Sequence, residues 1–142
     1  MNKNTLHSID PKAAWELLRQ NPRALLVDIR SSMEFLFVGH PVGAVHIAWI
    51  DEPDWDVNPN FVAEIRQLLL GGVSAGLAEG PAPVILICRS GNRSKDAGEL
   101  LVEQGVSEVY HIDEGFEGEL NDCHQRSALN GWRFHGLPWE QC

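Results

Sequence analysis

The feature that most constrains the fold of this chain is the unbroken apolar run VILIC at positions 84–88. A continuous apolar run of this length is typical of a strand that is buried on both faces, as at the centre of a parallel sheet. Three further segments read as strands, at 24–30 (ALLVDIR), 43–50 (GAVHIAWI) and 107–112 (SEVYHI). We therefore expect a sheet with the 84–88 strand in its interior.

Helical patterns occupy the segments around these strands. The first begins with Asp10 as a capping residue and Pro11 at the first helical position, and Asn21 and Pro22 end it. Strands and helices then alternate from residue 24 to residue 112, an order that predicts an α/β domain with right-handed crossovers. The fold class is thus a parallel sheet of about five strands with helices on both faces. The other predicted helices lie within 31–40, 60–73 and 93–105.

Length and composition are consistent with one domain. The chain has 142 residues, of which 44% are hydrophobic, enough for a single sizeable core. We place the domain at residues 8–140 and treat residues 1–7 as an N-terminal lead-in.

The net charge and the cysteine content indicate which partners and which compartment to expect. A net charge of −9, from 20 acidic against 11 basic residues, disfavours binding to nucleic acids and to anionic membranes. The N-terminus has no signal-peptide pattern, and no apolar run approaches the roughly 18 residues of a spanning helix. The three cysteines are too few and too scattered for a disulfide framework. We expect a cytoplasmic protein with reduced thiols.

Cys88 stands where the central strand ends, and a polar loop follows it. In a parallel sheet, sites gather at the carboxyl ends of the strands. The start of the next helix would direct unpaired N–H groups at the sulfur, and Gly91 allows the loop amides to turn inward around an anion. These features favour the thiolate, which is the nucleophilic form. The site is therefore Cys88 as nucleophile with an anion cradle formed by Arg89, Ser90, Gly91, Asn92, Arg93 and Ser94.

A charged residue so close to a core is usually paired. Asp28 ends a strand that should lie beside the 84–88 strand, so an Arg89–Asp28 ion pair is one arrangement that would hold the loop in shape. Solvated arginines, and a Cys88 that only fills space at a strand end, are the alternatives.

The loop CRSGNR resembles the active-site loop of the rhodanese family of sulfurtransferases. VDIRSSMEFLFVGHPVGAVHI at 27–47 is similar to the family's N-terminal signature, and VYHIDEGFEG at 109–118 resembles its strand and glycine turn beyond the catalytic helix. GLPW at 136–139 is like the end of many single-domain members. Together these motifs span nearly the whole chain, and they are specific as a set.

The resemblance implies a two-step reaction. The Cys88 thiolate would take a sulfane sulfur from thiosulfate or another persulfide donor, and a thiol, a protein acceptor or cyanide would then remove it. Asp28 and Glu34, both in the N-terminal signature, would support the loop. No cofactor is implied. Two segments, 51–60 and 71–83, are longer than a minimal domain needs and leave the choice of substrate open.

Two alternatives remain at this point. Cysteine phosphatases and arsenate reductases of similar fold place an arginine six positions after the cysteine, whereas here position 94 is Ser94 and the arginine is one residue earlier. The shorter loop suits a single sulfur atom better than a phosphoryl group. A non-catalytic rhodanese-like module that binds or regulates a partner is the other alternative, although such modules typically lack the cysteine.

The remaining reactive residues give weaker signals. Cys123 could resolve or accept sulfur but reads as an ordinary loop cysteine, and Cys142 is terminal. The six histidines show no zinc-like spacing, so we expect no metal. His40 and His46 more plainly serve to satisfy backbone groups near Gly39.

Overall fold

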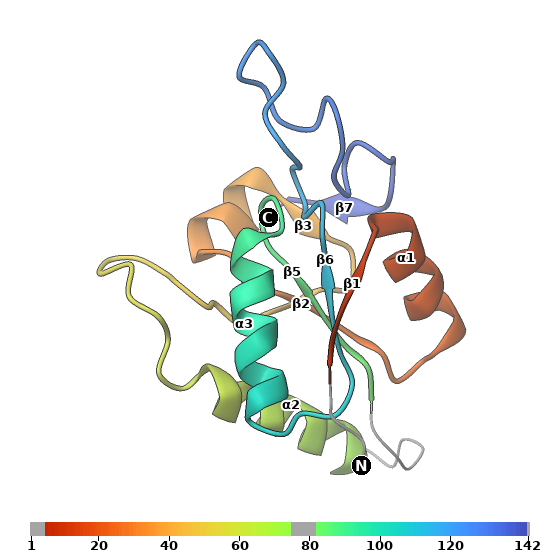
Figure 1. Cartoon of the computed structure of the whole chain (residues 1–142), viewed down its shortest axis with the longest axis vertical. Coiled ribbons are helices and arrows are strands. Elements are labelled where there is room, and N and C mark those ends of the chain that lie inside the picture. Colours follow the sequence, from red (N-terminus) through yellow and green to blue (C-terminus); the bar gives the residue numbers. More distant parts are fainter. Residues whose placement is uncertain (1–4, 75–81, 142) are drawn as a thin grey trace.

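The computed structural model describes residues 5–74 and 82–141. A five-stranded, wholly parallel sheet runs through the molecule in the order β1-β6-β5-β2-β4 (Figure 1). The predicted fold class is confirmed, with β5 at the centre of the sheet. Its strands are β1 Leu6–Ile9, β2 Leu25–Asp28, β4 Val45–His46, β5 Val84–Ile87 and β6 Val109–Ile112.

In the part of the chain that the structure describes, three α-helices cover the sheet from both sides. Helix α1, Pro11–Gln20, lies on one face, and α2, Phe61–Ser74, and α3, Asn92–Glu103, lie on the other (Figure 1). Asp10 caps α1, because its carboxylate accepts a hydrogen bond from the Ala13 N–H at 2.7 Å. Among the described residues, no helix combines the length and apolar character that crossing a bilayer would require.

Alternate side chains of β5 pack into two separate hydrophobic cores, one on each face of the sheet. Val84 and Leu86 pack with residues of α2 and α3, whereas Ile85 and Ile87 pack with Ala14 of α1. All four side chains are fully buried. The unbroken apolar run thus follows from burial on both faces, since successive side chains of a strand point to opposite sides of the sheet.

The C-terminal segment completes the hydrophobic core on the α1 face of the sheet. Trp132 is fully buried and packs with Phe116 and Leu137 in the cluster on the α1 face. Strand β7, Trp139–Glu140, then pairs antiparallel with β3, His40–Pro41, and joins the end of the chain to the segment after β2 (Figure 1). This pairing fixes the loops that surround the carboxyl ends of β2 and β5.

The structure differs from the sequence prediction in three places. Strand β1 begins at Leu6, so two residues of the predicted lead-in 1–7 belong to the sheet. The strand predicted at 43–50 is only two residues long in β4. The helix predicted within 31–40 contains a wider π-helical turn at Glu34–Val38, in which the Gly39 N–H reaches back five residues to the Glu34 carbonyl at 3.2 Å.

The two long segments differ in structure. The segment 51–60 is an irregular loop, and Val57 within it forms an isolated antiparallel bridge with Ile50, the residue before the segment. Asp51 ties this loop to Ser32, accepting hydrogen bonds from its N–H at 2.9 Å and its hydroxyl at 2.6 Å. In the segment 71–83, α2 continues to Ser74, and positions 75–81 lie outside the described residues.

Candidate active site

Cys88 directly follows β5 and lies at the base of the loop that leads into α3. Its side chain is 1% exposed. The backbone N–H groups of Gly91 and Ser94 both donate to Sγ, at 3.1 and 3.3 Å. These N–H groups belong to the cap and first turn of α3, whose amides have no partner within the helix. The sulfur therefore occupies the position in which a helix start stabilises an anion.

The loop holds this shape because two glycines let backbones approach closely. Gly91 has a φ of 104°, and a Cβ there would lie 2.1 Å from the Asp113 carbonyl oxygen. Gly115 faces Arg89 in the same way, where a Cβ would lie 2.5 Å from the Arg89 carbonyl carbon. Side chains at either position would push the cysteine loop away from the turn after β6.

Backbone hydrogen bonds complete this docking. The Phe116 N–H donates to the Cys88 carbonyl at 2.8 Å, and the N–H groups of Glu117 and Gly118 both donate to the Arg89 carbonyl at 3.0 Å. The glycine turn at 115–118 is therefore the platform on which the cysteine loop rests.

Arg93 is held by Glu34 in a two-pronged ion pair. Its two terminal nitrogens donate to the two carboxylate oxygens at 2.9 and 3.0 Å. Burial alone would raise the pKa of Glu34, but Arg93, the Ser31 N–H and Arg30 lower that pKa to about 2. Burial likewise would lower the pKa of Arg93, and Glu34 raises it instead. The pair is thus charged on both sides and anchors the first turn of α3 to the segment after β2.

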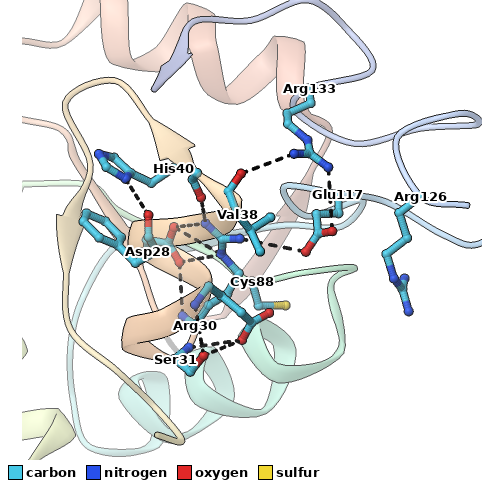
Figure 2. A network of polar contacts seen from close by, with 12 residues as sticks. Asp28, Arg30, Ser31, Val38, His40, Cys88, Glu117, Arg126 and Arg133 are labelled. Carbon is cyan, nitrogen blue, oxygen red and sulfur yellow. Dashed lines mark hydrogen bonds and ion pairs between the residues drawn. The ribbon is translucent and has the colours of Figure 1, made fainter. Parts of the chain in front are cut away.

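The predicted ion pair between Arg89 and Asp28 is wrong. Asp28 pairs with Arg30, whose Nη2 donates to Oδ2 at 2.6 Å, and both side chains are fully buried (Figure 2). Arg30 follows only two residues after Asp28, and its backbone N–H and Nε donate to the same carboxylate at 3.1 and 2.9 Å. Asp28 consequently supports the segment beside the loop through its pair with Arg30.

Arg30 links the end of β2 to the glycine turn at 115–118, the platform under the cysteine loop. Its guanidinium carbon lies 4.4 Å from the centre of the Phe116 ring, and its Nη1 lies 4.0 Å from a Glu117 carboxylate oxygen (Figure 2). Arg133 approaches the same carboxylate from the C-terminal segment at 3.7 Å. Sequence reasoning missed Glu117 and Arg133 because neither belongs to the loop itself.

A cleft of about 630 Å³ opens beside the cysteine loop. Arg89 is exposed on its wall, and within residues 5–74 and 82–141 its side chain has no hydrogen-bond or ion-pair partner. Trp55, 56% exposed, reaches the same cleft from the long 51–60 segment. The lining residues are Ser31, Met33, Glu34, Val38, Ile50, Trp55, Arg89, Arg93, Glu117 and Arg126.

The other predicted loop residues take different positions. Ser94 is fully buried under the sulfur, whereas Asn92 is exposed and Ser90 is intermediate. Cys123 is exposed in the C-terminal segment, and Cys142 lies outside the described residues. His40 and His46 contact the carbonyls of Phe35 and Arg30, each at 2.8 Å, as expected for histidines that satisfy backbone groups.

Sequence reasoning also missed His111, which contacts the Ser94 hydroxyl at 3.0 Å. The signal was available in its position. It lies near the carboxyl end of β6, beside β5, where parallel strands bring their functional side chains together.

The chain is similar to several known proteins. Thiosulfate sulfurtransferase GlpE from Haemophilus influenzae is 34% identical over 110 residues, which cover 78% of this chain and 84% of that protein. The homologous GlpE from Actinobacillus pleuropneumoniae is 30% identical and covers 96% of this chain and 94% of its own. The crystal structure of Rv0390 from M. tuberculosis has a TM-score of 0.81 and 41% identity, covering 98% of this chain and 99% of that one.

The family model for the Rhodanese-like domain matches residues 10–121. These residues include β2, the whole cysteine loop, α3 and the glycine turn that supports the loop. The chain belongs to the rhodanese-like domain family.

Proposed function

We propose that this protein is a sulfurtransferase that carries sulfur as a persulfide on Cys88. The single observation that carries the proposal is the pair of N–H groups, from Gly91 and Ser94, that donate to Sγ. Such donors stabilise the thiolate that attacks and the sulfur anion that results. Named thiosulfate sulfurtransferases among the relatives supply the substrate class.

In the first step, the Cys88 thiolate attacks the outer sulfur of thiosulfate. A bond forms between the two sulfurs, the sulfur–sulfur bond of thiosulfate breaks, and its electron pair leaves with sulfite. In the second step, an acceptor thiolate attacks the outer sulfur of the persulfide and restores the Cys88 thiolate. Charge balances in both steps without a cofactor, and the chemistry is covalent, double-displacement catalysis.

Arg89 is the residue we assign to donor binding. Its exposed guanidinium lines the cleft, whereas Arg93 already has both terminal nitrogens on Glu34. A guanidinium binds a sulfonate through charge-assisted hydrogen bonds. Arg89 would therefore orient the sulfite-forming end of thiosulfate, and the amides of residues 89–94 would surround the transferred sulfur.

The same contacts weigh against a phosphatase. A phosphatase loop needs an arginine that is free to bind the phosphoryl oxygens, and here Arg93 is anchored to Glu34. The two N–H groups that converge on Sγ leave a small cradle, which suits one sulfur atom better than a tetrahedral phosphate.

We further propose that the acceptor is a thiol, either of a small molecule or of a partner protein, and that the protein works in the cytoplasm. A reducing compartment keeps Cys88 available as a thiolate between turnovers. The negative net charge makes nucleic acids and anionic membranes poor partners for this chain.

Steady-state kinetics with thiosulfate and a thiol acceptor test the proposal. A double-displacement reaction gives parallel lines in double-reciprocal plots, and Cys88→Ser should abolish turnover. Cys123→Ser is the matched control and should keep the full rate, because that thiol is exposed in another segment. Arg89→Gln should raise KM for thiosulfate about tenfold, as expected for the loss of a hydrogen bond to a charged group. Turnover by Cys88→Ser would refute the proposal.

A further inference from the structure

A buried chain of polar side chains connects the sulfur of Cys88 to an imidazole. The Cys88 thiol donates to the Ser94 hydroxyl oxygen at 3.4 Å, and that oxygen lies 3.0 Å from Nδ1 of His111. Ser94 is fully buried and His111 is 6% exposed. Three residues from the loop, α3 and β6 thus form one hydrogen-bonded line that the double-displacement steps leave unused.

The Ser94 hydroxyl has one proton and three neighbours that can compete for it. These are the Cys88 sulfur, the imidazole nitrogen and the Gly91 carbonyl, which the hydroxyl reaches at 3.2 Å. If Nδ1 has no proton, it accepts the hydroxyl proton. If Nδ1 carries a proton, it donates to the hydroxyl oxygen, and the hydroxyl proton is released to the sulfur anion, which is the strongest remaining acceptor.

We propose that His111 is a positioning residue that acts through Ser94 to stabilise the anionic sulfur of Cys88. With the proton on Nδ1, it turns the Ser94 hydroxyl into a third hydrogen-bond donor, beside the N–H groups of Gly91 and Ser94. The inference rests on the proposed function insofar as the anion is the attacking thiolate or the persulfide.

The ring suits this role because its surroundings disfavour the charged imidazolium. Burial lowers the pKa of His111, Lys95 of α3 acts in the same direction, and the carboxylates of Asp113 and Glu99 oppose both. From the strand on its other side, Ser8 of β1 lies opposite His111 in the register and brings no charge. A neutral ring carries one proton, which can sit on either nitrogen.

The proton balance follows from a change of tautomer. In the thiol form, the thiol donates to Ser94, Ser94 donates to Nδ1, and the ring proton is on Nε2. On ionisation, the thiol proton passes to Ser94, the Ser94 proton passes to Nδ1, and Nε2 releases its proton to solvent. The result is a thiolate, a neutral ring with the proton on Nδ1, and one proton in the solvent.

Alkylation of Cys88 by iodoacetamide, followed across pH by mass spectrometry, tests the inference without any sulfur transfer. His111→Leu should slow alkylation about threefold near neutral pH and move the midpoint of the profile upward, because the Ser94 hydroxyl still donates to the anion but loses the Nδ1–H donor that strengthens this bond. His111→Asn should restore most of the rate, since its amide can donate from the place of Nδ1. Tyr110→Leu is the matched control, because Tyr110 lies on the opposite face of β6 and should leave the profile unchanged.

A double-variant cycle separates this role from a general loss of structure. Ser94→Ala should slow alkylation by itself, and adding His111→Leu to it should have no further effect, because His111 acts only through the hydroxyl. Nitrogen-15 shifts of the imidazole should show the proton moving from Nε2 to Nδ1 as Cys88 ionises, and should show no such change in Cys88→Ser. An unshifted profile in His111→Leu, or additive effects in the cycle, would overturn the inference. Failure of sulfur transfer with these results intact would refute only the proposed function.

Discussion

Two arginine–carboxylate pairs flank the candidate site, and they differ in burial and in what they hold. Asp28 and Arg30 are fully buried, and their pair joins the end of β2 to the platform under the cysteine loop. Glu34 and Arg93 are 20% and 24% exposed, and their pair joins α3 to the wall of the cleft. The first contact lies inside the core, and the second lies at the edge of the reaction space.

The difference in burial sets what each pair can contribute. A buried pair offsets a large desolvation cost, so removing one partner leaves a charge stranded in the core. A partly exposed pair contributes little to stability because water screens it, but it can still fix the geometry of a loop. We therefore expect the Asp28–Arg30 pair to govern folding and the Glu34–Arg93 pair to govern the rate of sulfur transfer.

The largest expected effect comes from breaking the buried pair. Arg30→Met should lower the free energy of unfolding by about 3–5 kcal/mol, because Asp28 then keeps an uncompensated charge in the core. Urea denaturation followed by circular dichroism measures this loss. The double variant Asp28→Leu/Arg30→Met should recover most of it, since no buried charge remains. A single variant as stable as the double variant would contradict the assigned role.

Breaking the partly exposed pair should change activity more than stability. Glu34→Gln should lower the free energy of unfolding by only about 1 kcal/mol. It should slow sulfur transfer about tenfold, because Arg93 no longer holds the first turn of α3 in place. Glu16→Gln, in the exposed pair with Arg19, is the matched control and should change neither quantity. If Glu34→Gln and Glu16→Gln lost equal activity, the Glu34–Arg93 pair would have no special role in sulfur transfer.

The smallest expected effect is the pH dependence of the stability that the Glu34–Arg93 pair contributes. The folded state lowers the pKa of Glu34 from 4.5 to about 2, so its stabilisation is complete above the higher value and disappears as the pH falls toward the lower one. The difference in unfolding free energy between the unmodified protein and Glu34→Gln should therefore shrink from about pH 6 to about pH 3. A difference that stays constant over this range would show that Glu34 is not stabilised as a carboxylate.

The same comparison explains how much could be predicted from the sequence. The sheet, the place of Cys88 and the loop that surrounds it were predictable, because β5 is a continuous apolar run with a polar loop and a helix start after it. Local chain order carries that information. The sequence also indicated that an arginine near the loop pairs with an acidic residue, but it did not identify which two residues form the pair.

Long-range pairing is where sequence reasoning failed. Strand β1 is a short edge strand with exposed His7 and Ser8, so it lacks the apolar run that marks a buried strand. Its position depends on β6, about a hundred residues later. The place of His111 near the end of β6 was predictable, but its contact with Ser94 depends on how α3 packs over β6. Such contacts are properties of the packed molecule and leave little trace in local periodicity.

The most direct test of the central claim is mass spectrometry of the protein after incubation with thiosulfate. The claim is that the cradle of N–H groups makes Cys88 the residue that carries sulfur. The account predicts a gain of one sulfur atom on the peptide containing Cys88, its loss on addition of a thiol, and an unchanged peptide containing Cys123. An unmodified Cys88 after treatment with several sulfane donors, or sulfur found on Cys123 instead, would contradict it.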